Sequence, residues 1–173
     1  MAGNGRWGEG PGPDSRPTYK VVMDTDFSFI GEFAHSLDEK GRLALPGKLR
    51  EELQKSERPE ELTARATKDG YVALYPYEQW MRVEANIRAI SDNTARDVAI
   101  REISGKAEKL NVDKSGRVLI IPNHREVSGL KREVTVLGGL YKIEVWDRAK
   151  LEARRIIDEP ALADVLRTVE IPL

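Results

Sequence analysis

A stretch of about ten residues occurs twice in this chain, and this repeat constrains the fold more than any other feature. The first copy is DEKGRLALP over residues 38–46, and the second is DKSGRVLIIP over residues 113–122. An offset of 75 residues relates three pairs of charged positions: Asp38 and Asp113, Arg42 and Arg117, and Arg50 and Arg125. A unit of roughly 70 residues buries too little surface to be stable alone. We therefore expect the two units to share one core.

Each copy predicts a strand, a tight turn, a second strand and a short helix. Apolar residues alternate with small or polar ones over residues 33–37, which is the period of a half-buried strand. Residues 38–41 match a type I turn, with Asp first and Gly fourth. The proline that ends each second strand suits the first turn of a helix, which in the first copy extends to about Lys55. In the second copy, residues 117–121 are apolar on both faces, which predicts a strand buried on both sides.

The remaining pattern predicts a hairpin in each unit and two helices between the units. Turn residues at 68–70 and a glycine pair at 138–139 separate the paired strands. Helical periodicity spans about 77–90 and 94–103, and Asp147 can cap a further helix. The expected fold class is α+β and β-rich, with the duplicated half forming a pseudo-twofold barrel with peripheral helices. The expected organisation is a flexible Gly/Pro-rich extension (1–26), a first unit (27–80), a helical insert (81–106), a second unit (107–152) and a C-terminal tail (153–173).

Composition excludes several classes of protein. The 173 residues include no cysteine, so neither a disulfide framework nor a thiolate zinc site is available. No apolar run is long enough to cross a bilayer, and residues 1–26 lack the apolar segment of a secretory signal. These features predict a cytoplasmic protein without a membrane partner.

The charge distribution is more informative than the total charge. A formal net charge of −1 argues against the broad basic surface of a typical nucleic-acid-binding domain. Residues 113–132 nevertheless hold five Lys or Arg against two acidic residues, and residues 40–50 hold four Lys or Arg that neighbouring acids dilute. On charge alone, a solvated surface explains each cluster better than a nucleic-acid-binding site does.

Residues for catalysis are scarce. The two histidines, His35 and His124, lie in different copies and belong to no metal-binding motif. His35 lies on the apolar face of its strand, which favours a hydrogen-bonded core residue. The glycine pair at 138–139 lacks the Gly-Lys-Ser/Thr of a phosphate loop. We therefore expect no enzyme, no cofactor, no metal and no small-molecule substrate.

The repeated turn is the better candidate for function. Asp38 and Arg42 stand four residues apart across the turn, where a carboxylate can orient a guanidinium. The glycine permits the backbone of the turn and is expected to leave space beside the following arginine. In one interpretation each aspartate serves the turn amides and pairs with its arginine. In the other, the arginines and lysines contact phosphates and guanine edges of DNA, and both can hold together. The candidate DNA-binding residues are Asp38, Lys40, Arg42, Lys48, Arg50, Asp113, Lys114, Arg117 and Arg125. Arg42 ranks above Arg117, since the strand after Arg117 looks more buried.

These motifs together resemble the MraZ family. The resemblance rests on GEF, LDxKGRLxLPxxxR, LYPxxxW, DxxGRxLIxPxxRxxxGL and EVWD, and it covers about residues 29–151. It implies a bacterial transcriptional regulator similar in fold to AbrB and SpoVT DNA-binding domains, with the two units packed as one swapped-hairpin barrel. Three features depart from the family pattern: the long Gly/Pro-rich start, Gly47 after Pro46, and His124 in place of leucine.

The resemblance also implies partners. Family members form rings, bind short direct repeats of double-stranded DNA upstream of their own division and cell-wall gene cluster, act mainly as repressors and associate with the nucleoid. In the family, the Asp-x-x-x-Arg motif is linked to DNA contact. A ring that presents the basic turn many times gains avidity. DNA binding is then compatible with a net charge near zero, because each subunit can bind weakly. The alternative is a protein-interaction module, because AbrB-like antitoxins bind a toxin through a tail, here residues 158–173.

Overall fold

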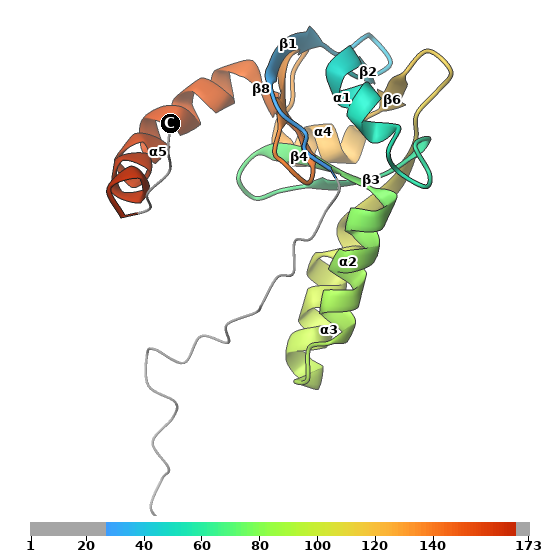
Figure 1. Cartoon of the computed structure of the whole chain (residues 1–173), viewed down its shortest axis with the longest axis vertical. Helices are drawn as coiled ribbons and strands as arrows, with labels where there is room; N and C mark the ends of the chain where they lie inside the picture. Colours follow the sequence, from blue (N-terminus) through green and yellow to red (C-terminus); the bar gives the residue numbers. More distant parts are fainter. Residues whose placement is uncertain (1–26, 169–173) are drawn as a thin grey trace, which may run out of the picture.

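Strands from the two repeat units are joined in antiparallel sheets, with helices around them (Figure 1). The computed structural model describes residues 27–168, so the expected N-terminal extension and the last five residues of the chain lie outside the description. The elements are β1 (Glu32–Ser36), β2 (Arg42–Ala44), α1 (Gly47–Leu53), β3 (Glu61–Ala66), β4 (Tyr71–Pro76), α2 (Tyr77–Arg88), α3 (Asn93–Glu102), the 3₁₀ turn η1 (Ser104–Lys106), β5 (Ala107–Asn111), β6 (Arg117–Leu119), α4 (Pro122–Ser128), β7 (Glu133–Gly138), β8 (Ile143–Asp147) and α5 (Arg148–Thr168). The fold class is α+β and strand-rich, as predicted.

Each unit pairs its first strand with the hairpin of the other unit. The larger sheet has the order β1-β7-β8-β4-β3-β5, and all its pairs are antiparallel. Strand β1 of the first unit pairs with β7, and β5 of the second unit pairs with β3. The registers correspond, because Ser36 lies opposite Glu133 and Asn111 lies opposite Glu61. The exchange explains why neither unit can complete its sheet alone.

The two strands that follow the repeated turns form a separate two-stranded ribbon. Strands β2 and β6 pair antiparallel with Leu43 opposite Val118, which are the same position of the two copies. The pseudo-twofold axis that relates the two copies therefore passes between these two residues. The ribbon is extended at both ends by equivalent backbone hydrogen bonds, from Leu45 N to Gly116 O (2.9 Å) and from Ile120 N to Gly41 O (3.0 Å).

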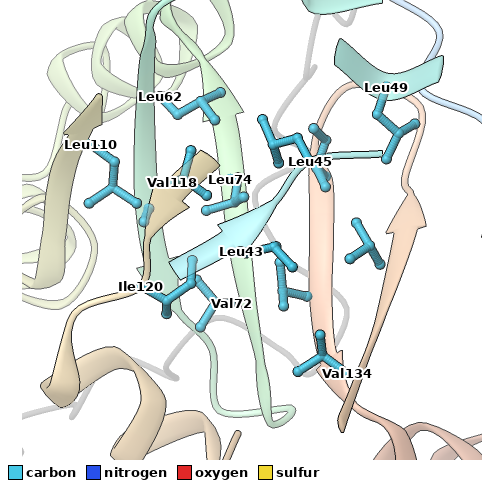
Figure 2. Close-up of a cluster of buried hydrophobic side chains, with 14 of the residues drawn as sticks. Leu43, Leu45, Leu49, Leu62, Val72, Leu74, Leu110, Val118, Ile120 and Val134 are labelled. Carbon is cyan, nitrogen blue, oxygen red and sulfur yellow. The ribbon is translucent and has the colours of Figure 1, made fainter. Parts of the chain in front are cut away.

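One hydrophobic core is built from both units, as the repeat predicted. Figure 2 shows side chains of β2 and β6 packed among those of the larger sheet. Members from both units are buried together: Leu43, Leu45, Leu49, Leu62, Val72, Leu74, Leu110, Val118, Ile120 and Val134. Burying such apolar side chains contributes roughly 1.5–3 kcal/mol each, so separating the units exposes much of what stabilises the fold.

The prediction that residues 117–121 are buried on both sides is wrong. Val118 and Ile120 are buried, but Leu119 between them is 46% exposed. The ribbon of β2 and β6 packs on the core with one face only, so successive side chains alternate between core and solvent. An apolar residue on the outer face of a short ribbon has the same sequence signature as a buried one.

The short helices begin and end close to where the prolines and glycines predicted. Gly129, with φ of +67°, ends α4 in the left-handed conformation. His124 is 2% exposed, and its Nε2 lies 3.2 Å from Lys106 O, whereas its Nδ1 is buried without a hydrogen-bond partner among residues 27–168. His35, in contrast, is only half-buried, and its side chain forms no hydrogen bond with residues 27–168. The prediction of a hydrogen-bonded core residue is therefore wrong for His35, because β1 is an edge strand.

Two groups of helices project from the sheets (Figure 1). Helices α2 and α3 lie close to the helical spans predicted over about 77–90 and 94–103, and they form a hairpin that extends away from the strands. Helix α5 begins after Asp147, whose Oδ1 accepts a hydrogen bond from Lys150 N (3.2 Å), and continues through Pro160 to Thr168. Leu151 is the buried residue of α5. No helix within residues 27–168 has the length and apolar character needed to span a bilayer.

Candidate nucleic-acid interface

The first repeated turn holds Arg42 in a fixed orientation. The Asp38 Oδ1 atom accepts hydrogen bonds from the backbone N–H groups of Lys40 and Arg42, both at 2.9 Å. The Asp38 Oδ2 atom accepts a hydrogen bond from Arg42 Nε at 2.6 Å. The aspartate thus serves the turn amides and pairs with its arginine, which is the structural role expected for it.

The second turn repeats this geometry. The Asp113 Oδ1 atom accepts from the backbone N–H groups of Ser115 (2.8 Å) and Arg117 (2.9 Å), and Oδ2 accepts from Arg117 Nε (2.9 Å). The side chains of Arg42 and Arg117 are 34% and 37% exposed. Greater burial therefore gives no reason to rank Arg117 below Arg42.

The ion pair leaves the outer part of each guanidinium free. The aspartate occupies Nε, whereas the Nη1 and Nη2 groups of Arg42 and Arg117 form no hydrogen bond with the described residues of the chain. These two groups carry four N–H donors in one plane. A planar donor set of this kind suits bidentate contact with a phosphate or with the O6 and N7 atoms of guanine.

The same hydrogen bonds predict an acid-sensitive contribution to stability. Donation from the backbone N–H of the following arginine lowers the pKa of Asp38 and of Asp113 below the ordinary value of 3.8, and the guanidinium lowers it further. A carboxyl whose pKa is lowered on folding stabilises the fold above its unfolded pKa, and this contribution is lost as the pH falls through the folded pKa.

We expect the Asp38→Asn/Asp113→Asn double variant to show a flatter dependence of the unfolding free energy on pH below about 4 than the wild type. Urea unfolding between about pH 5 and pH 2.5 measures this difference, and each single variant should show about half of it. Identical pH profiles for the wild type and the double variant would contradict the role given to the two carboxylates.

The glycine of each turn packs against an arginine from the other unit. A Cβ on Gly41 would lie 2.8 Å from Arg125 Cζ, and a Cβ on Gly116 would lie 2.8 Å from Arg50 Cδ. Both glycines also have positive φ, +80° and +73°, which other residues adopt at a cost. The expected space beside the following arginine is thus filled by a helix arginine of the opposite unit. Arg125 is half-buried there, and its Nε is buried without a hydrogen-bond partner among residues 27–168.

The other predicted residues lie around the two turns. Lys40 and Lys114 are exposed within the turns, and Lys48 and Arg50 are exposed on α1. The structure also adds two residues that sequence reasoning left out. Lys131 and Arg132 line a hollow of about 220 Å³ beside the first turn, together with Asp38 and Arg125. Both were counted among the basic residues of 113–132, but they belong to no motif. Their place beside the first turn is therefore visible only in the tertiary structure.

The described part of the chain offers no centre for metal chemistry. Within residues 27–168, no group of three or more His, Cys, Asp or Glu residues could hold a metal ion. The chemistry available at the turns is therefore hydrogen bonding and charge.

Comparison with known proteins shows the family of this chain. The family model described as "MraZ protein, putative antitoxin-like" matches residues 28–101 and 103–156. A protein named transcriptional regulator MraZ from Acetivibrio thermocellus is 37% identical over 127 residues, which are 72% of this chain and 85% of that protein. Proteins of the same name from Solidesulfovibrio magneticus and Lachnoclostridium phytofermentans are 38% and 31% identical, covering 73% and 79% of this chain and 84% and 93% of the relatives. With two repeat units that both match the family model, the chain belongs to the MraZ family.

Proposed function

We propose that the chain is a sequence-specific DNA-binding transcriptional regulator and not an enzyme. The observation that carries the proposal is the pair of arginines, Arg42 and Arg117, each held by an aspartate at Nε while its outer donors form no hydrogen bond with residues 27–168. Holding the side chain in place before binding reduces the entropy that a flexible arginine would lose on contact with a base edge. The relatives named above carry the name transcriptional regulator, which supports the same function.

We further propose that the strand exchange makes a swapped-hairpin barrel of the AbrB/SpoVT type and that copies of the chain assemble into a ring in the cytoplasm, on the nucleoid. Helix α5 supports assembly, because large apolar side chains on it are exposed to solvent in the single chain: Ile156, Ile157, Leu162, Val165 and Leu166. Several such side chains on one projecting helix favour a protein contact. A ring would present many turns at once, so weak contacts by each subunit would add up on repeated DNA sites.

The target that we propose is a set of direct repeats upstream of the protein's own gene, within a division and cell-wall gene cluster that the protein represses. We expect footprinting of this DNA with the full chain to show several protected sites at a regular spacing. Mass measurement of the same preparation should give a closed oligomer. Two results together would contradict sequence-specific regulation: no protected site on this DNA, and an affinity for unrelated duplexes equal to that for this DNA.

A second candidate is an antitoxin-like module that binds a protein partner through its C-terminal part. The observations that favour it are the wording of the family description and the exposed apolar residues of α5. Purification of the full chain from its native host would then recover a small partner in a fixed stoichiometry. The DNA-binding proposal predicts recovery of the oligomer without such a partner.

A further inference from the structure

The repeat places an equivalent hollow beside each turn. One hollow of about 220 Å³ lies beside the first turn, and one of about 380 Å³ lies beside the second. Equivalent backbone hydrogen bonds show which residues of the two hollows correspond. Leu37 N donates to Arg132 O at 2.8 Å in the first, and Val112 N donates to Glu60 O at 2.8 Å in the second. Arg132 thus takes the place of Glu60, and the preceding residue, Lys131, takes the place of Pro59.

The two hollows differ in charge. Arg125, Lys131 and Arg132 line the first, and none of their side chains forms an ion pair or hydrogen bond with residues 27–168. One of the two acids there, Asp38, is held by Arg42, which leaves Glu39.

The second hollow is lined by two cations, Arg50 and Lys114, and Glu60 stands where the first has Arg132. Its other acid, Asp113, is held by Arg117. The first hollow therefore gathers three unpaired cations against one unpaired acid, and the second gathers two against one.

We propose that the hollow beside the first turn is a binding pocket for a phosphate of the DNA backbone, held by Arg125, Lys131 and Arg132, and that the hollow beside the second turn does not serve this role. The inference rests on the proposed DNA-binding function and assigns the phosphate contact to one of the two turns. Guanidinium and ammonium groups donate charge-assisted hydrogen bonds to phosphate oxygens.

The position of the pocket would fix how the duplex lies relative to the first turn. Asp38 borders the hollow and also holds Arg42. A phosphate bound there would set the duplex against the first turn, where Arg42 can reach a base edge. Phosphate contacts of this kind position the protein, whereas base contacts select the sequence. The first turn would then be the anchored reader, and the second turn would act without a phosphate anchor.

The test uses the full chain and two duplexes, one from upstream of its own gene and one of unrelated sequence. Lys131→Gln/Arg132→Gln removes two charges from exposed side chains whose backbone hydrogen bonds remain. We expect the slope of log K against log salt concentration to become shallower by about 0.9 for each bound subunit, because the pocket holds one phosphate and each phosphate contact contributes about 0.9. The affinity should fall by a similar factor on both duplexes. Arg88→Gln/Arg101→Gln, on the helical insert, removes the same charge and should leave the slope unchanged.

Two further arms decide the alternatives. Glu60→Arg introduces the missing cation beside the second turn and should make the slope steeper. An unchanged slope in Lys131→Gln/Arg132→Gln, with normal binding by the wild type, would overturn the pocket and leave the proposed function standing. Failure of the wild type to bind either duplex would overturn both. If inorganic phosphate binds the wild type but not Lys131→Gln/Arg132→Gln, and the salt slope of DNA binding is the same in both proteins, the ligand is free phosphate and the DNA-backbone assignment is wrong.

Discussion

Replacing Arg42 by alanine is expected to weaken binding to DNA from upstream of the gene by roughly 5- to 150-fold. A bidentate arginine contact with a base contributes about 1–3 kcal/mol of discrimination, and about 1.4 kcal/mol corresponds to a tenfold change in affinity. Asp38 holds the Nε of Arg42 at 2.6 Å, and the Nη groups of Arg42 form no hydrogen bond with residues 27–168. Fluorescence anisotropy with a labelled duplex measures the loss, and an oligomer that engages several repeats would enlarge it.

Controls separate the charge of Arg42 from its orientation. Arg88→Ala removes an arginine that is 71% exposed on α2, away from the turns, and should leave the affinity unchanged. Asp38→Asn keeps the positive charge of Arg42 but weakens the contact that orients it. This variant should therefore retain binding to unrelated DNA and lose selectivity for the upstream duplex. Equal affinity of Arg42→Ala and wild type for the upstream duplex would show that the first turn does not read DNA.

Replacing Leu43 by alanine is expected to destabilise the fold by about 2–5 kcal/mol, the range for removing a large buried aliphatic side chain. Leu43 is fully buried and lies opposite Val118 across the pseudo-twofold axis, so the cavity would open where the two units meet. For a domain of this size the melting temperature should fall by about 2–4 °C for each kcal/mol. Thermal unfolding followed by circular dichroism measures the shift.

The neighbouring strand supplies a matched control. Leu119 lies in β6 opposite Arg42 and is 46% exposed. Leu119→Ala should therefore change the melting temperature much less than Leu43→Ala. If both variants unfold at the same temperature, the ribbon does not contribute to a common core, and the packing of the two units would need another explanation.

Local signals allowed much of the secondary structure to be predicted. Pro122 and Gly129 begin and end α4 because the chemistry of a helix terminus depends on a few adjacent residues. The burial of residues 117–121 could not be predicted in the same way. Whether Leu119 faces the core depends on what covers the ribbon, and that is decided by segments far away in the sequence.

The candidate site shows the same division. Asp38 and Arg42 were singled out because they are four residues apart across a turn, and a contact of that range is determined by local backbone geometry. Lys131 and Arg132 are more than ninety residues from that turn in sequence. They reach it through the hydrogen bond from Leu37 N to Arg132 O, which is made by backbone atoms and leaves no trace in the residue types.

The sequence by itself determined that the chain has two related units and that each places an aspartate four residues before an arginine across a turn, and it predicted that the units share one core. Only the tertiary structure decided that the units exchange strands, that Arg50 and Arg125 cover the glycines of the opposite turns, and that three cations gather beside the first turn and two beside the second. The physical reason is the range of the interactions. Turn hydrogen bonds act over four residues, whereas strand pairing and burial join segments whose distance in sequence places no limit on their contact.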